Sequence, residues 1–442
     1  MKKNSTLVII FCSTIIFGDM FVQTIYANPT NESQTSDPEQ ENIEATPTPD
    51  LTELPSKPIF IHVLLNELDA QTRSSHTISS SNGFVLESPI GLKKALWKKN
   101  TKITIIVKEN TLYLQCKDGK YRNVINNNLA VTPIDGILHF DNRSYQGTLN
   151  IRIDKEKKAL LLINKISLDD YIYSVLRFES LSYWPLEMQK VQAVASRTYA
   201  VYQMLEARTK RGKNVGYDIK NTNFHQVYRG AHDCTHLRKA VEETHNLILT
   251  HNKGVALTMF DICCGGVVPS DMKKADPKKP YLYRTNQCTF CEKKSLFKWQ
   301  EHLCPIEMLK QLKANKKVAH HLRPIKEITH MVVHERDKAG IAHKIRIANN
   351  EKSVIVPAAD VKASLETKLK SLALDVKLRN EKVMLTGRGF GHNLGLCQLG
   401  ARELVAQGWN FKDILAFYYP STNLARLRPT TKATQHEIKI NT

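Results

Sequence analysis

The sequence predicts an α+β protein in which a β-rich N-terminal part precedes a region of mixed helices and strands. The chain has 442 residues, of which 42% are hydrophobic and 24% charged, enough for about two to three globular cores. From Pro58 to Ile166, β-rich runs alternate with turn residues, and at Ser167 the spacing of apolar residues becomes helical. This composition excludes a fully disordered chain, a collagen-like fibre and a small disulfide-stapled protein.

The N-terminus has the pattern of an export signal. Two lysines precede the apolar run 7–17, and polar sequence begins after Ala27. We therefore predict a signal peptide over residues 1–27 and a protein that works in the periplasm or cell envelope, outside the cytoplasmic membrane. The alternative is an uncleaved N-terminal anchor, which would be the chain's only membrane contact. Gly18 and Asp19 interrupt the roughly 20 apolar residues that a membrane span needs.

Charge is distributed unevenly along the chain. Residues 28–56 are polar and acidic with almost no large apolar side chains, which predicts a disordered linker. The chain contains 63 Lys and Arg against 43 Asp and Glu, a net charge of +20. Because residues 1–56 carry −6, the remainder carries +26. Such a body is expected to attract anionic partners, such as phosphates, acidic polysaccharides or an anionic membrane surface.

Residues 57–166 form the predicted β-rich part. They contain no cluster of acids or histidines, so we expect a platform without chemistry of its own. The expected strands are 59–64, 102–108, 111–116, 136–140, 147–153 and 159–163.

Two helices are expected next. Ser167 followed by two aspartates predicts a helix start, and Pro185 fits the first turn of a second helix that reaches about Arg208. Lys190 and Arg197 are seven residues apart, so they share one face of this second helix.

Glu179 lies in the link between these helices, beside three aromatic residues. Partial burial of this carboxyl would raise its pKa and suit it to hold a proton near neutrality. The alternative is a surface glutamate that pairs with Arg177 or Lys190.

Several sequence blocks, taken in order, resemble the SpoIID/LytB family of bacterial cell-wall proteins, over about residues 58–425. The blocks are Ser167–Tyr171, Lys190–Ala200, Gln226–Gly230, Cys264–Gly266, Gly387–Ala401 and Tyr418–Pro420. The chain departs from the family's usual Ser-Gln-Trp-Gly at Cys397–Gly400. The resemblance implies one body with a groove, its catalytic region over residues 167–425 and a basic tail over 426–442.

The resemblance implies a peptidoglycan lytic transglycosylase of the stage II sporulation protein D type. The family's catalytic acid falls on Glu179. The other positions that match residues lining or near the groove are Lys190, Arg197, Tyr199, Gln226, His392 and Gln398. The expected reaction cleaves denuded glycan between N-acetylmuramic acid and N-acetylglucosamine and leaves a 1,6-anhydro end. It requires no cofactor, and the lactyl carboxylates of such strands would suit a basic partner.

Five cysteines fall in the segment 261–304. The spacing of Cys288 and Cys291 suits one tetrahedral metal, with Cys264 upstream, and some family members hold zinc here. The fourth ligand stays open, and the candidates are Asp261, Cys263 or a distant histidine. The alternative is disulfide bonding, which is natural in an exported protein.

Two further function classes fit parts of the sequence. A non-catalytic wall-binding module that stimulates an amidase is also known in the resembled family. Nucleic-acid binding is suggested only by charge. It is not expected, because the chain lacks basic residues interleaved with aromatic ones and begins with an export signal.

Overall fold

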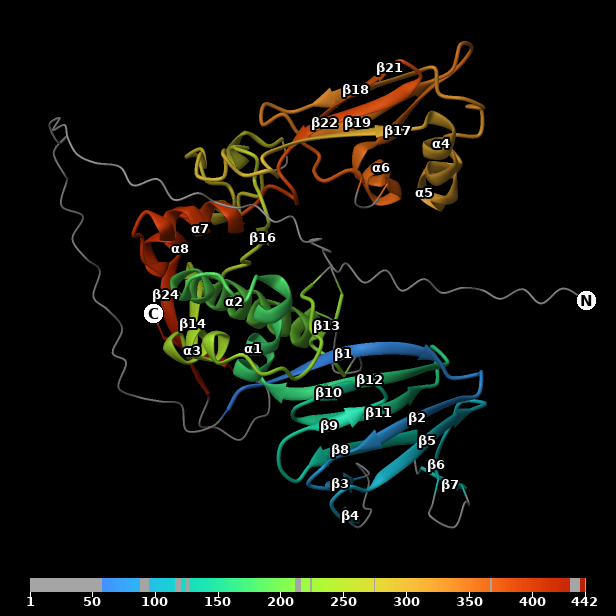
Figure 1. Cartoon of the computed structure of the whole chain (residues 1–442), viewed down its shortest axis with the longest axis vertical. Helices are drawn as coiled ribbons and strands as arrows, with labels where there is room; N and C mark the ends of the chain where they lie inside the picture. The colour runs from blue at the N-terminus through green and yellow to red at the C-terminus, as the bar shows by residue number, and fades with distance from the viewer. Residues whose placement is uncertain are drawn as a thin grey trace, which may run out of the picture. The chain divides into compact units, whose positions relative to one another are not determined.

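The computed structural model describes residues 58–87, 95–115, 121–124, 127–210, 216–222, 225–273, 275–365, 368–429 and 438–441 (Figure 1). The predicted signal peptide and acidic linker lie outside these residues. The structure combines helices with strands in several sheets, so the predicted α+β class is confirmed. No helix in the described ranges is long and apolar enough to cross a membrane.

Two sheets form the β-rich N-terminal part. The seven-stranded sheet has the order β13 (Ile219–Lys220), β1 (Phe60–Asp69), β12 (Ala159–Ser167), β11 (Thr148–Asp154), β8 (Asn128–Pro133), β3 (Phe84–Glu87) and β4 (Ala95–Trp97). The six-stranded sheet has the order β10 (Arg143–Tyr145), β9 (Leu138–Phe140), β2 (Ser74–Ser79), β5 (Lys102–Lys108), β6 (Thr111–Gln115) and β7 (Tyr121–Asn123). Alternate side chains of these strands enter one core, as Leu149, Ile151 and Ile153 do from β11.

The two predicted helices are confirmed. Helix α1 (Leu168–Glu179) begins after Ser167, whose Oγ accepts a hydrogen bond from the Asp170 backbone N–H at 3.1 Å. Helix α2 (Leu186–Lys210) is buried on two sides, because some of its side chains join the core of the β-rich part and others join a second core. Helix α3 (Thr235–Glu243) packs against both α1 and α2.

The second core lies between α2 and the C-terminal elements. A four-stranded sheet has the order β15 (Gly254–Val255), β14 (Leu247–His251), β24 (Asn423–Pro429) and β25 (Ile438–Asn441). The remaining elements are β16 (Phe260–Asp261), which pairs with β23 (Leu396–Cys397), the 3-10 turns η2 (Pro269–Asp271) and η3 (Pro280–Leu282), α7 (Gln398–Ala406) and α8 (Phe411–Tyr418). The predicted tail from residue 426 therefore begins inside β24.

Residues 298–388, here called the insert, have a core of their own. Its two three-stranded sheets are β17 (Lys298–Leu303), β22 (Lys382–Arg388) and β21 (Leu374–Arg379), and β18 (His330–Arg336), β19 (Ala342–Ala348) and β20 (Ser353–Pro357). Its helices are α4 (Pro305–Ala314), α5 (Lys316–Ala319) and α6 (Ala358–Leu365).

Candidate functional site

Glu179 is the last residue of α1, and two distant segments hold it in place. The helix ends because Ser180 adopts an extended conformation. The Glu179 Oε1 atom accepts a hydrogen bond from the Val227 backbone N–H at 2.6 Å. Its backbone carbonyl accepts one from Gln398 Nε2 at 2.7 Å. Both the backbone and the half-buried side chain of Glu179 are therefore held in place by hydrogen bonds.

The surroundings of Glu179 favour its protonated form. Burial raises the pKa of Glu179 and outweighs the Val227 N–H, which lowers it. Within the described part of the chain Glu179 forms no ion pair, because Arg177 donates to Ser182 and Lys190 pairs with other acids. The alternative of a paired surface glutamate therefore does not describe this structure.

Gln226 and Gln398, both predicted near the substrate, are buried. Gln226 accepts a hydrogen bond from the Tyr171 hydroxyl at 3.0 Å and donates to the Ser196 carbonyl at 3.2 Å, so it joins α1 to α2. Gln398 binds the Glu179 carbonyl and lies 3.2 Å from Gln192 Oε1. The structure thus assigns both amides to supporting the acid from within the protein.

Tyr199 lies on α2 with its side chain half-buried. Burial raises the pKa of Tyr199 to about 12, and the nearby charge of Glu179 contributes to this rise, while a hydrogen bond with Gln203 opposes it. Tyr199 therefore remains a neutral phenol near Glu179 at any physiological pH.

The positions of Lys190 and Arg197 differ from the prediction. They share the face of α2 that meets α3, as their spacing indicates. Lys190 Nζ lies 2.6 Å from both Glu187 and Glu243. Arg197 is fully buried and donates to Asp169 Oδ1 at 3.1 Å. Because the Arg197 side chain has no exposed surface, it supports the helices and does not line a surface that glycan could reach.

His392 lies in the turn between β22 and β23 and is exposed. Its Nδ1 accepts a hydrogen bond from the Leu394 backbone N–H at 3.0 Å and lies 3.8 Å from Asp261 Oδ2. A side chain on Gly391 would collide with Asp261, since a Cβ there would come within 2.2 Å of it. His392 is thus held in a glycine turn around Asp261, and no described contact joins it to Glu179.

Four buried cysteines form a candidate metal site. The Sγ atoms of Cys264, Cys288, Cys291 and Cys397 all lie within 4.8 Å of one another. Zn–S bonds of about 2.3 Å in a tetrahedron separate the sulfurs by about 3.8 Å. The Cys264 and Cys291 sulfurs are 3.7 Å apart, and the described cysteines form no disulfide. The set therefore fits a zinc ion better than the disulfide alternative.

The fourth member of this set is Cys397, and the prediction of Asp261 is corrected. Asp261 Oδ2 accepts a hydrogen bond from the Asn393 backbone N–H at 2.7 Å, and Asp261 is not among the clustered groups. Cys397 caps α7, and its sulfur accepts hydrogen bonds from the backbone N–H groups of Gly400 and Cys264. The Cys-Gln-Leu-Gly block that departs from the resembled family thus supplies the ligand.

A buried arginine that was not predicted from the sequence lies against this site and would balance the charge of the thiolates around a bound metal. Arg284 is 2% exposed and donates to Cys264 Sγ at 3.4 Å and to the Val267 carbonyl at 3.3 Å. No acid in the described ranges pairs with it, and its Nε and one terminal nitrogen have no hydrogen-bond partner. Four thiolates around one zinc ion carry a net charge of about −2, which a buried guanidinium would offset.

Glycine at position 400 is required by the same site. A Cβ there would lie 2.8 Å from the sulfur of Cys288 and 2.2 Å from the hydroxyl of Tyr418. The close approach of α7 to the four sulfurs therefore leaves no room for a side chain.

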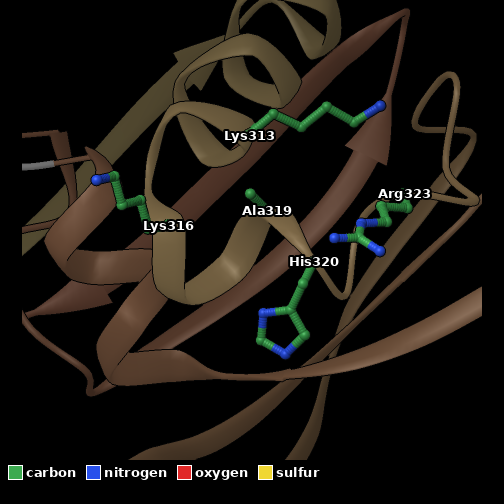
Figure 2. A pocket seen from close by; sticks show the side chains of 5 residues that line it. All are labelled: Lys313, Lys316, Ala319, His320 and Arg323. Carbon is green, nitrogen blue, oxygen red and sulfur yellow. The ribbon is translucent and has the colours of Figure 1, made fainter.

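Two hollows in the described part of the chain are lined by residues other than Glu179. One of about 460 Å³ belongs to the insert and is lined by Lys313, Lys316, Ala319, His320 and Arg323 (Figure 2). The other, of about 300 Å³, is lined by Tyr202, His251, Val255, Lys278, Lys279 and Tyr281. Its aromatic and basic lining suits an anionic sugar, and Tyr202 is one helical turn from Tyr199 along α2.

Two segments of the chain match known protein-family models. Residues 156–251, which include Glu179, match the SpoIID model, described as stage II sporulation protein. Residues 224–395 match a domain of unknown function, DUF8618.

Similarity to whole proteins extends further along the chain. An uncharacterised protein of Brachyspira hyodysenteriae is 28% identical over 341 residues, 76% of this chain and 86% of that protein. The amidase enhancer of Bacillus subtilis is 26% identical over 326 residues, 65% of this chain and 45% of the enhancer. Stage II sporulation protein D of the same species is 24% identical over 276 residues, 60% of this chain and 76% of that protein.

Proposed function

We propose that the chain, which matches the SpoIID family model over residues 156–251, is a peptidoglycan lytic transglycosylase acting outside the cytoplasmic membrane. It would cleave denuded glycan strands between N-acetylmuramic acid and N-acetylglucosamine. The observation that carries this proposal is Glu179, a carboxyl free of ion pairs among the described residues, with its pKa raised by burial and its position fixed by Val227 and Gln398.

One carboxyl is enough for this reaction. Protonated Glu179 would donate its proton to the glycosidic oxygen as the bond to the muramyl anomeric carbon breaks. The C6 hydroxyl of the same muramyl residue would attack that carbon and return its proton to Glu179. No water is consumed, and the enzyme ends in its starting state. Ordinary glycosidases, by contrast, need a second carboxylate to handle water or to act as nucleophile.

The cysteine site would serve this chemistry indirectly. When bound, zinc would cross-link the chain, and four protein ligands would leave no open position for catalysis. Cys397 directly precedes Gln398, whose amide holds the Glu179 carbonyl. The site would therefore fix the start of α7 and, through Gln398, the acid.

The second candidate function is stimulation of an amidase without glycan cleavage. It is favoured by the 26% identity to the amidase enhancer of Bacillus subtilis. In that case the protein would bind the wall and act through an amidase partner.

Purified denuded strands separate the two candidates. The protein alone should release fragments with 1,6-anhydro-muramyl ends, measured by mass spectrometry. Fragments with ordinary reducing ends would mean hydrolysis and would contradict the lytic reaction. Unchanged strands, together with faster peptide release when an N-acetylmuramoyl-L-alanine amidase is added to intact peptidoglycan, would establish the enhancer role instead.

A further inference from the structure

The segment Gln226–Gly230 runs along α1 and is anchored at alternate residues. Gln226 binds the Tyr171 hydroxyl, and the Tyr228 ring stacks on Tyr171 with centroids 5.4 Å apart. The Gly230 carbonyl accepts a hydrogen bond from the Ser174 hydroxyl at 2.6 Å. Residues 226, 228 and 230 are buried, whereas 227 and 229 are half-buried. The segment therefore presents residue 229 on its more exposed side from a rigid support.

Residue 229 is an arginine that contacts the residue preceding Glu179 and forms no described ion pair with Glu179. The Arg229 guanidinium lies over the Phe178 ring, 5.1 Å from its centroid. Phe178 directly precedes Glu179, and Val227, two residues before Arg229, donates its N–H to the Glu179 carboxyl. Among the described residues no acid forms an ion pair with Arg229; the ion pairs in this region are those of Lys190, Arg197 and Arg238. Its charge is therefore available to a ligand.

The other cations expected at this site are already neutralised. Lys190 lies between two glutamates and Arg197 is buried against Asp169. Arg238 resembles Arg229 in that it stacks on an aromatic ring, Tyr173, at 3.7 Å, but it also pairs with Asp170 at 2.8 Å. Arg229 thus differs from Lys190, Arg197 and Arg238 in having an aromatic support and no carboxylate partner among the described residues.

We infer that Arg229, held against Phe178, binds a carboxylate of the glycan beside the bond to be cleaved. A planar guanidinium on an aromatic face presents paired N–H donors that match a carboxylate. In the proposed substrate this group is the lactyl carboxylate of a muramyl residue, so the inference rests on the proposed function. Arg229 would select strands that carry free carboxylates over neutral glycan of the same backbone.

Binding can be measured apart from cleavage with the Glu179→Gln protein. The probes are denuded strands and chitin oligomers of equal length, which lack the lactyl carboxylate. We expect the parent to prefer denuded strands. Arg229→Gln should weaken their binding by roughly tenfold to a hundredfold and remove the preference, because a charge-assisted contact is lost. Arg229→Lys should keep part of the preference for denuded strands, since the positive charge remains although the paired N–H donors are lost.

Arg238→Gln is the matched control, because that guanidinium also stacks on a ring but is already paired, and it should leave the preference unchanged. Equal preference in Arg229→Gln and the parent would overturn the inference. So would a parent that binds chitin oligomers as well as denuded strands. If the wild-type protein cleaves nothing but the Arg229-dependent preference persists, the proposed enzyme activity fails while the recognition role stands.

Discussion

Around Glu179, the two basic side chains that were predicted to bind glycan both have carboxylate partners. Lys190 lies between Glu187 and Glu243, and Arg197 is buried against Asp169. In the insert, by contrast, exposed cations line a hollow of about 460 Å³, and no acid of the described chain pairs with them (Figure 2). These are Lys313, Lys316 and Arg323. Of these three side chains, only Lys313 forms a hydrogen bond within the described ranges, from its ammonium to the Ile325 carbonyl at 2.6 Å.

This difference shows that an anion-binding site cannot be predicted from net charge or from two basic residues that share a helix face. In the helical part, burial requires charges to be compensated, as Asp169 does for Arg197, and the sulfur of Cys264 accepts a hydrogen bond from buried Arg284. In the insert, solvent screens the cations, so they need no partner. The helical part is therefore expected to control stability and chemistry, and the insert to contribute long-range attraction.

The largest effect is expected from the cysteine site in the helical part. Cys397→Ser should lower the bound zinc to well below one ion per chain and lower the melting temperature by on the order of 10 °C, because a structural metal couples to folding. Metal content by atomic spectroscopy and thermal unfolding measure this. The control is Cys304→Ser, which removes an exposed thiol outside the cluster. Full zinc content in Cys397→Ser would show that the fourth ligand is another group.

The next effect tests charge compensation directly. Arg197→Met should lower the free energy of unfolding by about 3 kcal/mol, since it breaks a buried ion pair. Lys190→Met should cost less than about 1 kcal/mol, because its partners are partly exposed. Urea unfolding measures both. An equal loss of unfolding free energy in both variants would contradict the expectation that the buried Arg197 ion pair stabilises the fold more than the partly exposed Lys190 pairs.

The pH dependence of cleavage should reflect the protonation of Glu179 and should not depend on the cations of the insert. A general acid works when protonated, so cleavage should fall as pH rises through the raised pKa of Glu179, above the usual value of about 4.3. Because the folded state holds this proton more tightly than the unfolded chain, the free energy of unfolding should also fall with rising pH across that window. A profile centred at or below the usual glutamate pKa would contradict the effect of burial.

The smallest effect on stability is expected in the insert. Lys313→Gln, Lys316→Gln and Arg323→Gln together should change the free energy of unfolding by less than about 0.5 kcal/mol, because these side chains are exposed. Binding of denuded strands should become several-fold weaker at low salt and less salt-dependent. Affinity measured at two salt concentrations tests this. If the salt dependence of binding is unchanged, the cations of the insert do not contribute to the attraction of glycan.

Local signals in the sequence were enough to predict the elements that carry Glu179. The Ser167 cap and the helical spacing after Pro185 predicted α1 and α2, and a run of β-branched residues predicted β5. Strand β2 was missed because its sequence has a single large apolar side chain, Ile78, and its conformation depends on pairing with β5.

The site was less predictable for a different physical reason. Val227 acts through its backbone N–H, which no side-chain pattern reveals. Cys397 and Arg284 meet the other cysteines only through tertiary folding. A motif match also cannot separate residues that touch a ligand from residues that hold the acid, which is why Gln226 and Arg197 were expected at the substrate and lie buried.

The cleavage rate of Glu179→Gln on denuded strands tests the central claim most directly. The amide oxygen can still accept the Val227 N–H, so the fold should survive, and a circular dichroism spectrum like the parent's would verify this. Without a proton to donate and recover, release of 1,6-anhydro ends should fall by about 100-fold to 10,000-fold. A variant that releases these ends as fast as the parent would show that Glu179 is not the catalytic acid.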